Sequence, residues 1–267
     1  MTDFFYRLPI WASAILVLGV SVAIGLGSSV GLRRIFRLRT TAEEREVGTN
    51  LMQVVAAYIG IMIAFAGVQV WQDFADAQEA VFRESATAAE LYRDLTAYGP
   101  ETLAARSALR AYVDSVLDDE WPLLEKGRKS SVTEARLADL FAQFAKIRPQ
   151  DNRDSAMYSE AFSKLNDLVG LRRERLIDSR SGIPGILWAV ALVGSLLTVA
   201  YASAFSSTRY NVAMTAGVSL SLGMMLLFIL VVDKPFRGDF SVSNEELSQL
   251  PQAFDALDRH FSAAPSR

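Results

Sequence analysis

The chain has 267 residues, of which 51 % are hydrophobic and 21 % charged, and its formal net charge at pH 7 is −3. This charge, without a basic run beside an aromatic platform, argues against a nucleic-acid partner. The chain has no cysteine and one histidine, His260, which excludes disulfides and thiolate metal sites. No phosphate loop or nucleophile motif is present, so we expect no enzyme activity, no cofactor and no metal site.

Four apolar windows are long enough to cross a bilayer, for which a helix needs about 20 apolar residues. They lie at about residues 8–32, 51–71, 183–205 and 212–232. The first window is too long for a signal peptide, and its basic residues follow it instead of preceding it. Trp71 and Trp188 fall near window ends, where indole rings prefer the membrane interface. The sequence therefore predicts four transmembrane helices.

Residues 72–182 are charged, and their apolar positions recur every three or four residues, which is typical of amphipathic helices. No Pro or Gly separates this segment from the second window. We therefore expect one helix over residues 50–98, roughly 70 Å long. Further helices are predicted at about 101–125, 131–147 and 155–180, and no part of the segment resembles a strand.

These patterns predict an all-α polytopic membrane protein with a helical extramembrane insert between its second and third transmembrane helices. Four regions follow from them. Residues 1–71 hold transmembrane helices 1 and 2 with a basic loop, and residues 72–182 form a four-helix extramembrane domain. Residues 183–232 hold transmembrane helices 3 and 4, and residues 233–267 form a Pro-Phe-x-Gly turn and a polar tail.

Gln53, Ala57, Ile61 and Phe65 lie at steps of four in the second window, so they share one face of its helix. Two interpretations remain open at this point. The face could pack against other transmembrane helices. It could instead line a pore with a polar entrance and an apolar constriction, which gates by dewetting.

Two short stretches carry a resemblance to a known family. "IGIMIAFAGVQVW" (59–71) resembles the second transmembrane helix of bestrophins, the pentameric anion channels, and "DKPFRGDF" (233–240) resembles the segment after their last one. The order of two spans, a helical insert and two spans is similar too. The resemblance implies a homo-oligomer, with the pentamer as the family's arrangement. It also implies passive permeation of small anions through a pore lined by Gln53, Ala57, Ile61 and Phe65.

The same resemblance assigns a role to the turn after the last span. We expect Pro235 and Gly238 to turn the chain off the membrane, with Phe236 between them. Asp233 and Asp239 would bind backbone amides or a cation, so that the turn acts as a latch. Arg237 separates Phe236 from Gly238, and the acidic cluster that holds calcium in animal bestrophins is thin here, so calcium gating does not carry over.

Localisation and orientation follow from the same patterns. We expect a multi-pass protein of the bacterial inner (plasma) membrane, with the lipid bilayer as a partner. The basic first loop, with Arg37 and Arg39, favours an insert outside the cell, whereas the family arrangement puts the insert in the cytoplasm, as does the arginine group 172–180. We prefer the family arrangement. The alternative function is a membrane-anchored helical sensor or scaffold without transport activity.

Overall fold

The computed structural model describes residues 2–35, 41–203 and 208–263, and the regular elements among them are helical. It divides into two compact units. The first, the membrane unit, comprises Met1–Asp73, Gly182–Lys234 and Gly238–Ser241. The second, the helical domain, comprises Phe74–Ser181, Pro235–Arg237 and Val242–Arg267. Helix α2 (Ala42–Tyr98) passes from the first unit into the second without a break.

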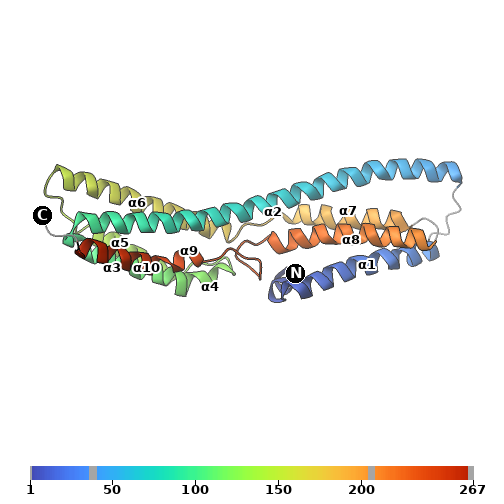
Figure 1. Cartoon of the computed structure of the whole chain (residues 1–267). Coiled ribbons are helices and arrows are strands. Elements are labelled where there is room, and N and C mark those ends of the chain that lie inside the picture. The colour runs from blue at the N-terminus through green and yellow to red at the C-terminus, as the bar shows by residue number, and fades with distance from the viewer. Residues whose placement is uncertain (1, 36–40, 204–207, 264–267) are drawn as a thin grey trace. The chain divides into compact units, whose positions relative to one another are not determined.

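The membrane unit contains a short helix, η1 (Thr2–Arg7), and the helices α1 (Ile10–Ile35), α7 (Gly185–Ser203) and α8 (Arg209–Val232) besides the first part of α2. Helices α1, α7 and α8 lie side by side (Figure 1). Four helices of the described residues are long and apolar enough to cross a membrane, and they are α1, α2, α7 and α8. The prediction of four transmembrane helices is thus confirmed. Residue 205, the expected end of the third window, and Arg37 and Arg39 lie outside the described residues.

Small residues set the packing of α1 against α8. A Cβ atom on Gly223 would lie 2.7 Å from the Oγ of Ser21, and one on Gly25 would overlap Ser219. The two serine hydroxyls donate to carbonyl oxygens of their own helices, Ser21 to Val17 and Ser219 to Thr215, both at 2.8 Å. This reciprocal pair of Ser and Gly allows two backbones to approach closely, as is usual between membrane helices.

One face of helix α2 approaches α7 at Gly194 and α8 at Gly67. Ile59, Ile63, Ala66 and Val70 are buried at its inward positions. A Cβ atom on Gly194 of α7 would lie 2.7 Å from the Ile59 side chain, so the two helices meet at this glycine. The inward spacing of four, three and four residues is that of one helix face.

The helical domain is built from the second part of α2 and the following helices, which are η2 (Pro100–Thr102), α3 (Leu103–Ser115), α4 (Trp121–Leu124), α5 (Ser131–Phe144), α6 (Asn152–Asp178), α9 (Glu245–Ser248) and α10 (Leu250–Ala263). The helix expected over residues 101–125 is not uniform. A π-helical turn, η3 (Val116–Glu120), separates α3 from α4. Pro122 lies in the first turn of α4, where a proline is tolerated because the amide hydrogen that it lacks has no partner within the helix.

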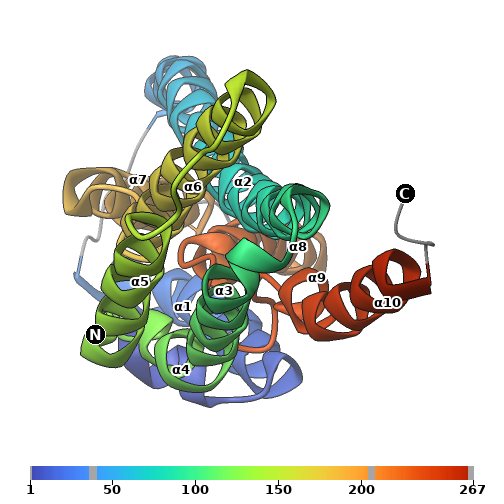
Figure 2. The ribbon, with the colours of Figure 1, turned by 90° about the vertical axis from the view of Figure 1, so that its left-hand side faces the viewer.

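The last part of the chain, expected as a polar tail, includes a helix that packs within the helical domain. Helix α10 contacts both α3 and α9, and Figure 2 shows α9 next to α10. Leu250 and Phe254 are buried, and the Phe254 ring stacks on Tyr92 of α2 at 4.1 Å between centroids. The hydroxyl of Tyr92 donates to Asp258 at 2.7 Å, and Arg110 of α3 contacts the same carboxylate at 2.8 Å.

Candidate functional site

The four residues of the predicted pore stripe lie on the exposed face of α2. Gln53 and Ala57 are exposed, and Ile61 and Phe65 have 56 % and 67 % of their surface accessible. The opposite face of the same helix carries the buried residues Ile59, Ile63, Ala66 and Val70. None of the four therefore belongs to the core of the membrane unit, and the residues that the structure describes leave Ile61 and Phe65, one turn apart, largely uncovered.

The polarity of this face changes along the helix. Gln53 lies at one end of the stripe and Gln69 beyond the other, where its Nε2 donates to Asp73 Oδ1 at 2.7 Å. Ile61 and Phe65 form the apolar middle. An apolar constriction between polar ends can gate ions by dewetting, but one helix face encloses nothing. Several copies of α2 around an axis are needed for this chemistry.

Asp233 follows the last residue of α8, and its carboxylate is buried. Its Oδ1 accepts a hydrogen bond from the Ile183 amide at 2.7 Å, and the Trp188 indole binds the same carboxylate. Burial raises the pKa of Asp233 above its ordinary value, although the Ile183 amide, Lys234 and Trp188 act in the opposite direction. Asp233 thus ties the end of α8 to the segment that enters α7.

Asp239 and Gly238 hold the other end of the turn within the membrane unit. The Oδ2 of Asp239 accepts from the amide of Ile10 at 2.9 Å, so an acid caps the N-terminus of α1. Gly238 has a φ of +78°, and a Cβ atom there would lie 3.3 Å from Tyr6 Cδ1. Glycine is the residue that adopts this conformation without steric cost.

Pro235 and Phe236 pack within the helical domain, where both are buried. The Phe236 ring meets Trp121 edge-on at 5.7 Å, and the Pro235 carbonyl accepts from the Val242 amide at 2.7 Å. The five predicted turn residues therefore divide between the units: Asp233, Gly238 and Asp239 in the first, Pro235 and Phe236 in the second. No acidic cluster fit for a metal ion occurs among the residues that the structure describes.

A buried ionic cluster in the helical domain was not predicted. Arg175 of α6 contacts Glu84 of α2 at 2.5 Å and Glu120 of η3 at 3.1 Å. Arg172 binds Glu120 at 2.5 Å, and the Tyr112 hydroxyl donates to Glu84 at 2.9 Å. The two carboxylates and two guanidinium groups balance in charge. Burial lowers the pKa of Arg175 but the adjacent Glu84 more than compensates, so its pKa is raised and it stays charged.

The sequence does contain a signal for this cluster. Glu84 takes an inward position in the apolar series Ala77, Val81, Ala88 and Leu91 of α2. Arg172 and Arg175 likewise continue the inward series of α6 that includes Leu165 and Leu168. A charged residue at an apolar register position in each of two helices indicates a buried ion pair, because an unpaired buried charge is too costly.

Comparison with known proteins gives one family and one fold. A crystal structure of a membrane protein aligns with a TM-score of 0.68 at 13 % identity, over 92 % of this chain and 98 % of its own. Two crystal structures are of single-residue variants of a bacterial bestrophin homologue from Klebsiella pneumoniae. They align with TM-scores of 0.67 and 0.68 at 13 % and 12 % identity, over 91 % and 92 % of this chain and 98 % of theirs. No curated protein matches the chain.

The structural likeness, at such low identity, shows the fold alone. The family is shown by the sequence itself, because the Bestrophin-like domain matches residues 19–247. The four apolar helices with a helical insert between the second and third agree with this match. The chain is therefore a helical membrane protein that belongs to the Bestrophin-like family.

Proposed function

We propose that this chain is one subunit of an oligomeric membrane channel, in which copies of α2 surround a pore that passes small anions by diffusion. Gln53, Ala57, Ile61 and Phe65 line that pore. The observation that carries the proposal is the exposure of Ile61 and Phe65 on a stripe with polar ends. Membership of a family of channels, rather than enzymes, supports it.

The assembly is a homo-oligomer of the bacterial inner membrane, with each chain crossing the bilayer four times. In a single chain, the apolar middle of the α2 face is exposed. In a ring of identical copies, this face of each copy would point toward the shared axis. Closed cyclic symmetry is the usual arrangement of such homo-oligomers. We propose the pentamer of the bestrophins as the arrangement.

The direct test is ion flux through purified protein in liposomes. Replacing Ile61 or Phe65 with Ala widens an apolar constriction, so efflux of chloride should rise severalfold for each variant. Leu197→Ala is the matched control, because Leu197 is equally exposed but lies on α7. It should conduct like the parent.

The outcomes separate this proposal from its alternatives. If the two α2 residues served only in packing, their truncation would lower stability without raising flux. Potassium flux above chloride flux would contradict the anion preference. A folded protein that conducts neither ion, before or after substitution, would end the channel proposal and leave the sensor or scaffold function.

A further inference from the structure

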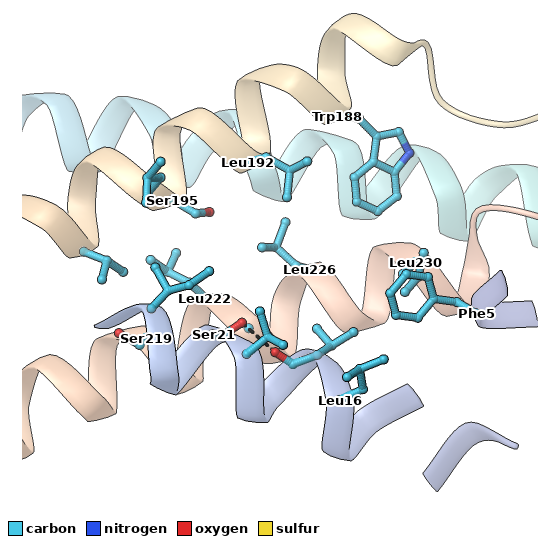
Figure 3. A pocket seen from close by; sticks show the side chains of 16 residues that line it. Phe5, Leu16, Ser21, Trp188, Leu192, Ser195, Ser219, Leu222, Leu226 and Leu230 are labelled. Atoms are coloured by element: carbon cyan, nitrogen blue, oxygen red, sulfur yellow. Dashed lines mark hydrogen bonds between the residues drawn. The ribbon is translucent and has the colours of Figure 1, made fainter. Parts of the chain in front are cut away.

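A cavity of about 420 Å³ lies within the membrane unit between α1, α7 and α8 (Figure 3). Helices α1 and α8 pack closely through Ser21, Gly25, Ser219 and Gly223. Helix α7 closes the third side of the cavity with Trp188, Leu192 and Ser195. In Figure 3, Trp188 and Phe5 lie toward one end of this space and Ser195 toward the other.

The wall of the cavity is apolar apart from serine hydroxyls, and part of its rim is exposed on the surface of the membrane helices. Leu16, Val20, Leu192 and Leu196 line it and are exposed. These helices face hydrocarbon in a bilayer, so a molecule that enters through this rim comes from the lipid phase. The volume lies within the range of small-molecule sites, about 300–1,000 Å³.

Ser195 is the residue in this wall whose polar group lacks a hydrogen-bond partner. It is 7 % exposed, and its Oγ makes no hydrogen bond to any residue that the structure describes. Other hydroxyls on these helices bind the carbonyl four residues back, including Ser21, Ser219, Ser221 and Thr198. That bond is the usual way to satisfy a serine inside a membrane helix. The Ser195 hydroxyl instead lies at the cavity wall with a hydrogen to donate.

The depth of Ser195 selects among lipid-phase molecules. It lies ten residues after Gly185, the first residue of α7, hence roughly 15 Å into the bilayer, near the middle of a hydrocarbon core of about 30 Å. At that depth a phospholipid presents only its acyl chain, because its ester oxygens stay at the interface. A phospholipid could fill the cavity but would leave the Ser195 hydroxyl without an acceptor.

We propose that this cavity binds a small lipophilic molecule with a single hydroxyl or carbonyl oxygen, which accepts a hydrogen bond from Ser195 while its apolar part lies against Trp188 and Phe5. A long-chain alcohol has this chemistry. The site is separate from the α2 stripe, and its occupancy does not depend on ion conduction.

Trp188 provides a reporter within the site. We would reconstitute the full chain in phosphatidylcholine vesicles and titrate it with a terminally brominated long-chain alcohol, since bromine quenches indole fluorescence on contact. Quenching should saturate, and Trp188→Phe should abolish the saturable component, although three other tryptophans remain.

Removal of the hydroxyl tests the hydrogen bond. Ser195→Ala should raise the dissociation constant about two- to twelve-fold, which is the range for one hydrogen bond. Ser221→Ala is the matched control, because Ser221 lies on α8 outside this cavity and binds Gly217. It should bind the alcohol like the parent. A brominated alkane of equal length should be indifferent to Ser195→Ala.

Three results would overturn the proposal. Equal affinity of parent and Ser195→Ala for the alcohol would show a cavity that holds acyl chains only. Quenching that rises in proportion to probe, without saturation, would show simple partition into the bilayer. Absence of Trp188 quenching by either probe would show that the space is closed in the assembled protein.

Discussion

Buried charged residues in both units are held by particular partners. Asp233 is the clearest case in the membrane unit, because one carboxylate serves the amide of Ile183 and the indole of Trp188. Glu84 and Glu120 are likewise buried in the helical domain, where each carboxylate forms a salt bridge with an arginine side chain. In both units a buried charge stabilises the fold only while its hydrogen-bond partners stay in place.

The raised pKa of Asp233 predicts a pH effect with a definite sign. The folded protein holds this proton more tightly than the unfolded chain, so stability falls as pH rises from the ordinary aspartate range through the raised pKa. Asp233→Asn keeps an acceptor oxygen and removes the titration. Its melting temperature should therefore vary less than that of the parent across this acidic window.

The acceptor itself is tested by Asp233→Ala. This variant leaves the buried Ile183 amide and the indole of half-buried Trp188 without their acceptor, and an unpaired buried donor costs about 1–3 kcal/mol. Thermal melting should place it well below Asp233→Asn at neutral pH. Equal melting of the two variants would mean that the hydrogen bonds to Asp233 add nothing.

Arg175 is predicted to be the most sensitive ionic residue of the helical domain. Arg175→Met would leave Glu84 buried without its cation, which should destabilise the domain by about 3–5 kcal/mol in chemical denaturation. Adding Glu84→Gln should restore part of the loss, because the uncompensated charge is then gone.

The matched control is Lys129→Met, which breaks the exposed pair of Lys129 with Glu134. Exposed pairs contribute little, so its unfolding should be close to that of the parent. Similar losses for Arg175→Met and Lys129→Met would contradict the importance given to burial.

At the scale of elements, the features that local sequence signals encode could be predicted. No Gly or Pro lies between the second window and residue 98, which predicted one long helix, and α2 is continuous from Ala42 to Tyr98. The π-helical turn at Val116–Glu120 could not be predicted from spacing, because a shift of one hydrogen bond leaves the apolar series nearly unchanged. Helix α10 was missed although its sequence carries a helical signal, since Leu250, Phe254, Leu257 and Phe261 recur every three or four residues.

For the candidate site, the sequence predicted only that four residues share one face of a helix. Steps of four placed Gln53, Ala57, Ile61 and Phe65 together on α2, and the structure adds that this face is exposed. The acids of the turn were expected to bind amides or a cation. Which amides they reach, those of Ile183 and Ile10, depends on segments about 50 and 229 positions away and has no local signal.

The turn after α8 depends on one backbone conformation. Gly238→Ala should cost about 1–2 kcal/mol, because its φ of +78° is unfavourable for a residue with a Cβ atom and the added atom meets Tyr6. Gly170→Ala is the control, since Gly170 lies in α6 with open space around its Cβ position. There alanine should stabilise by about 0.5–1 kcal/mol. Melting curves in which both variants move the same way would show that the turn is indifferent to its glycine.

At the scale of the whole molecule, the number of arginines before α7 overstates the support that they give to a cytoplasmic insert. Arg172 and Arg175 precede α7 but are buried in ion pairs, so among the arginines at 172–180 only Arg173 and Arg180 remain exposed. The proposed cytoplasmic insert therefore rests mainly on the family arrangement.

Single cysteines test this orientation cleanly, because the chain has none of its own. Ser107 is exposed in α3, and Thr41 is exposed before α2. With an impermeant maleimide on intact cells, Thr41→Cys should be labelled and Ser107→Cys protected until the cells are opened. The reverse pattern would place the insert outside the cell and favour a sensor.

The central claim is that the exposed stripe of α2 faces a pore, and charge placed on that stripe tests it most directly. Ile61→Cys in liposomes would be treated with a negatively charged methanethiosulfonate while chloride efflux is followed, with Leu197→Cys as the lipid-facing control. The pore predicts an immediate change in efflux for Ile61→Cys, reversed by a reducing agent, and no change for Leu197→Cys. Complete modification of Ile61→Cys, verified by mass, with unaltered chloride efflux would contradict it.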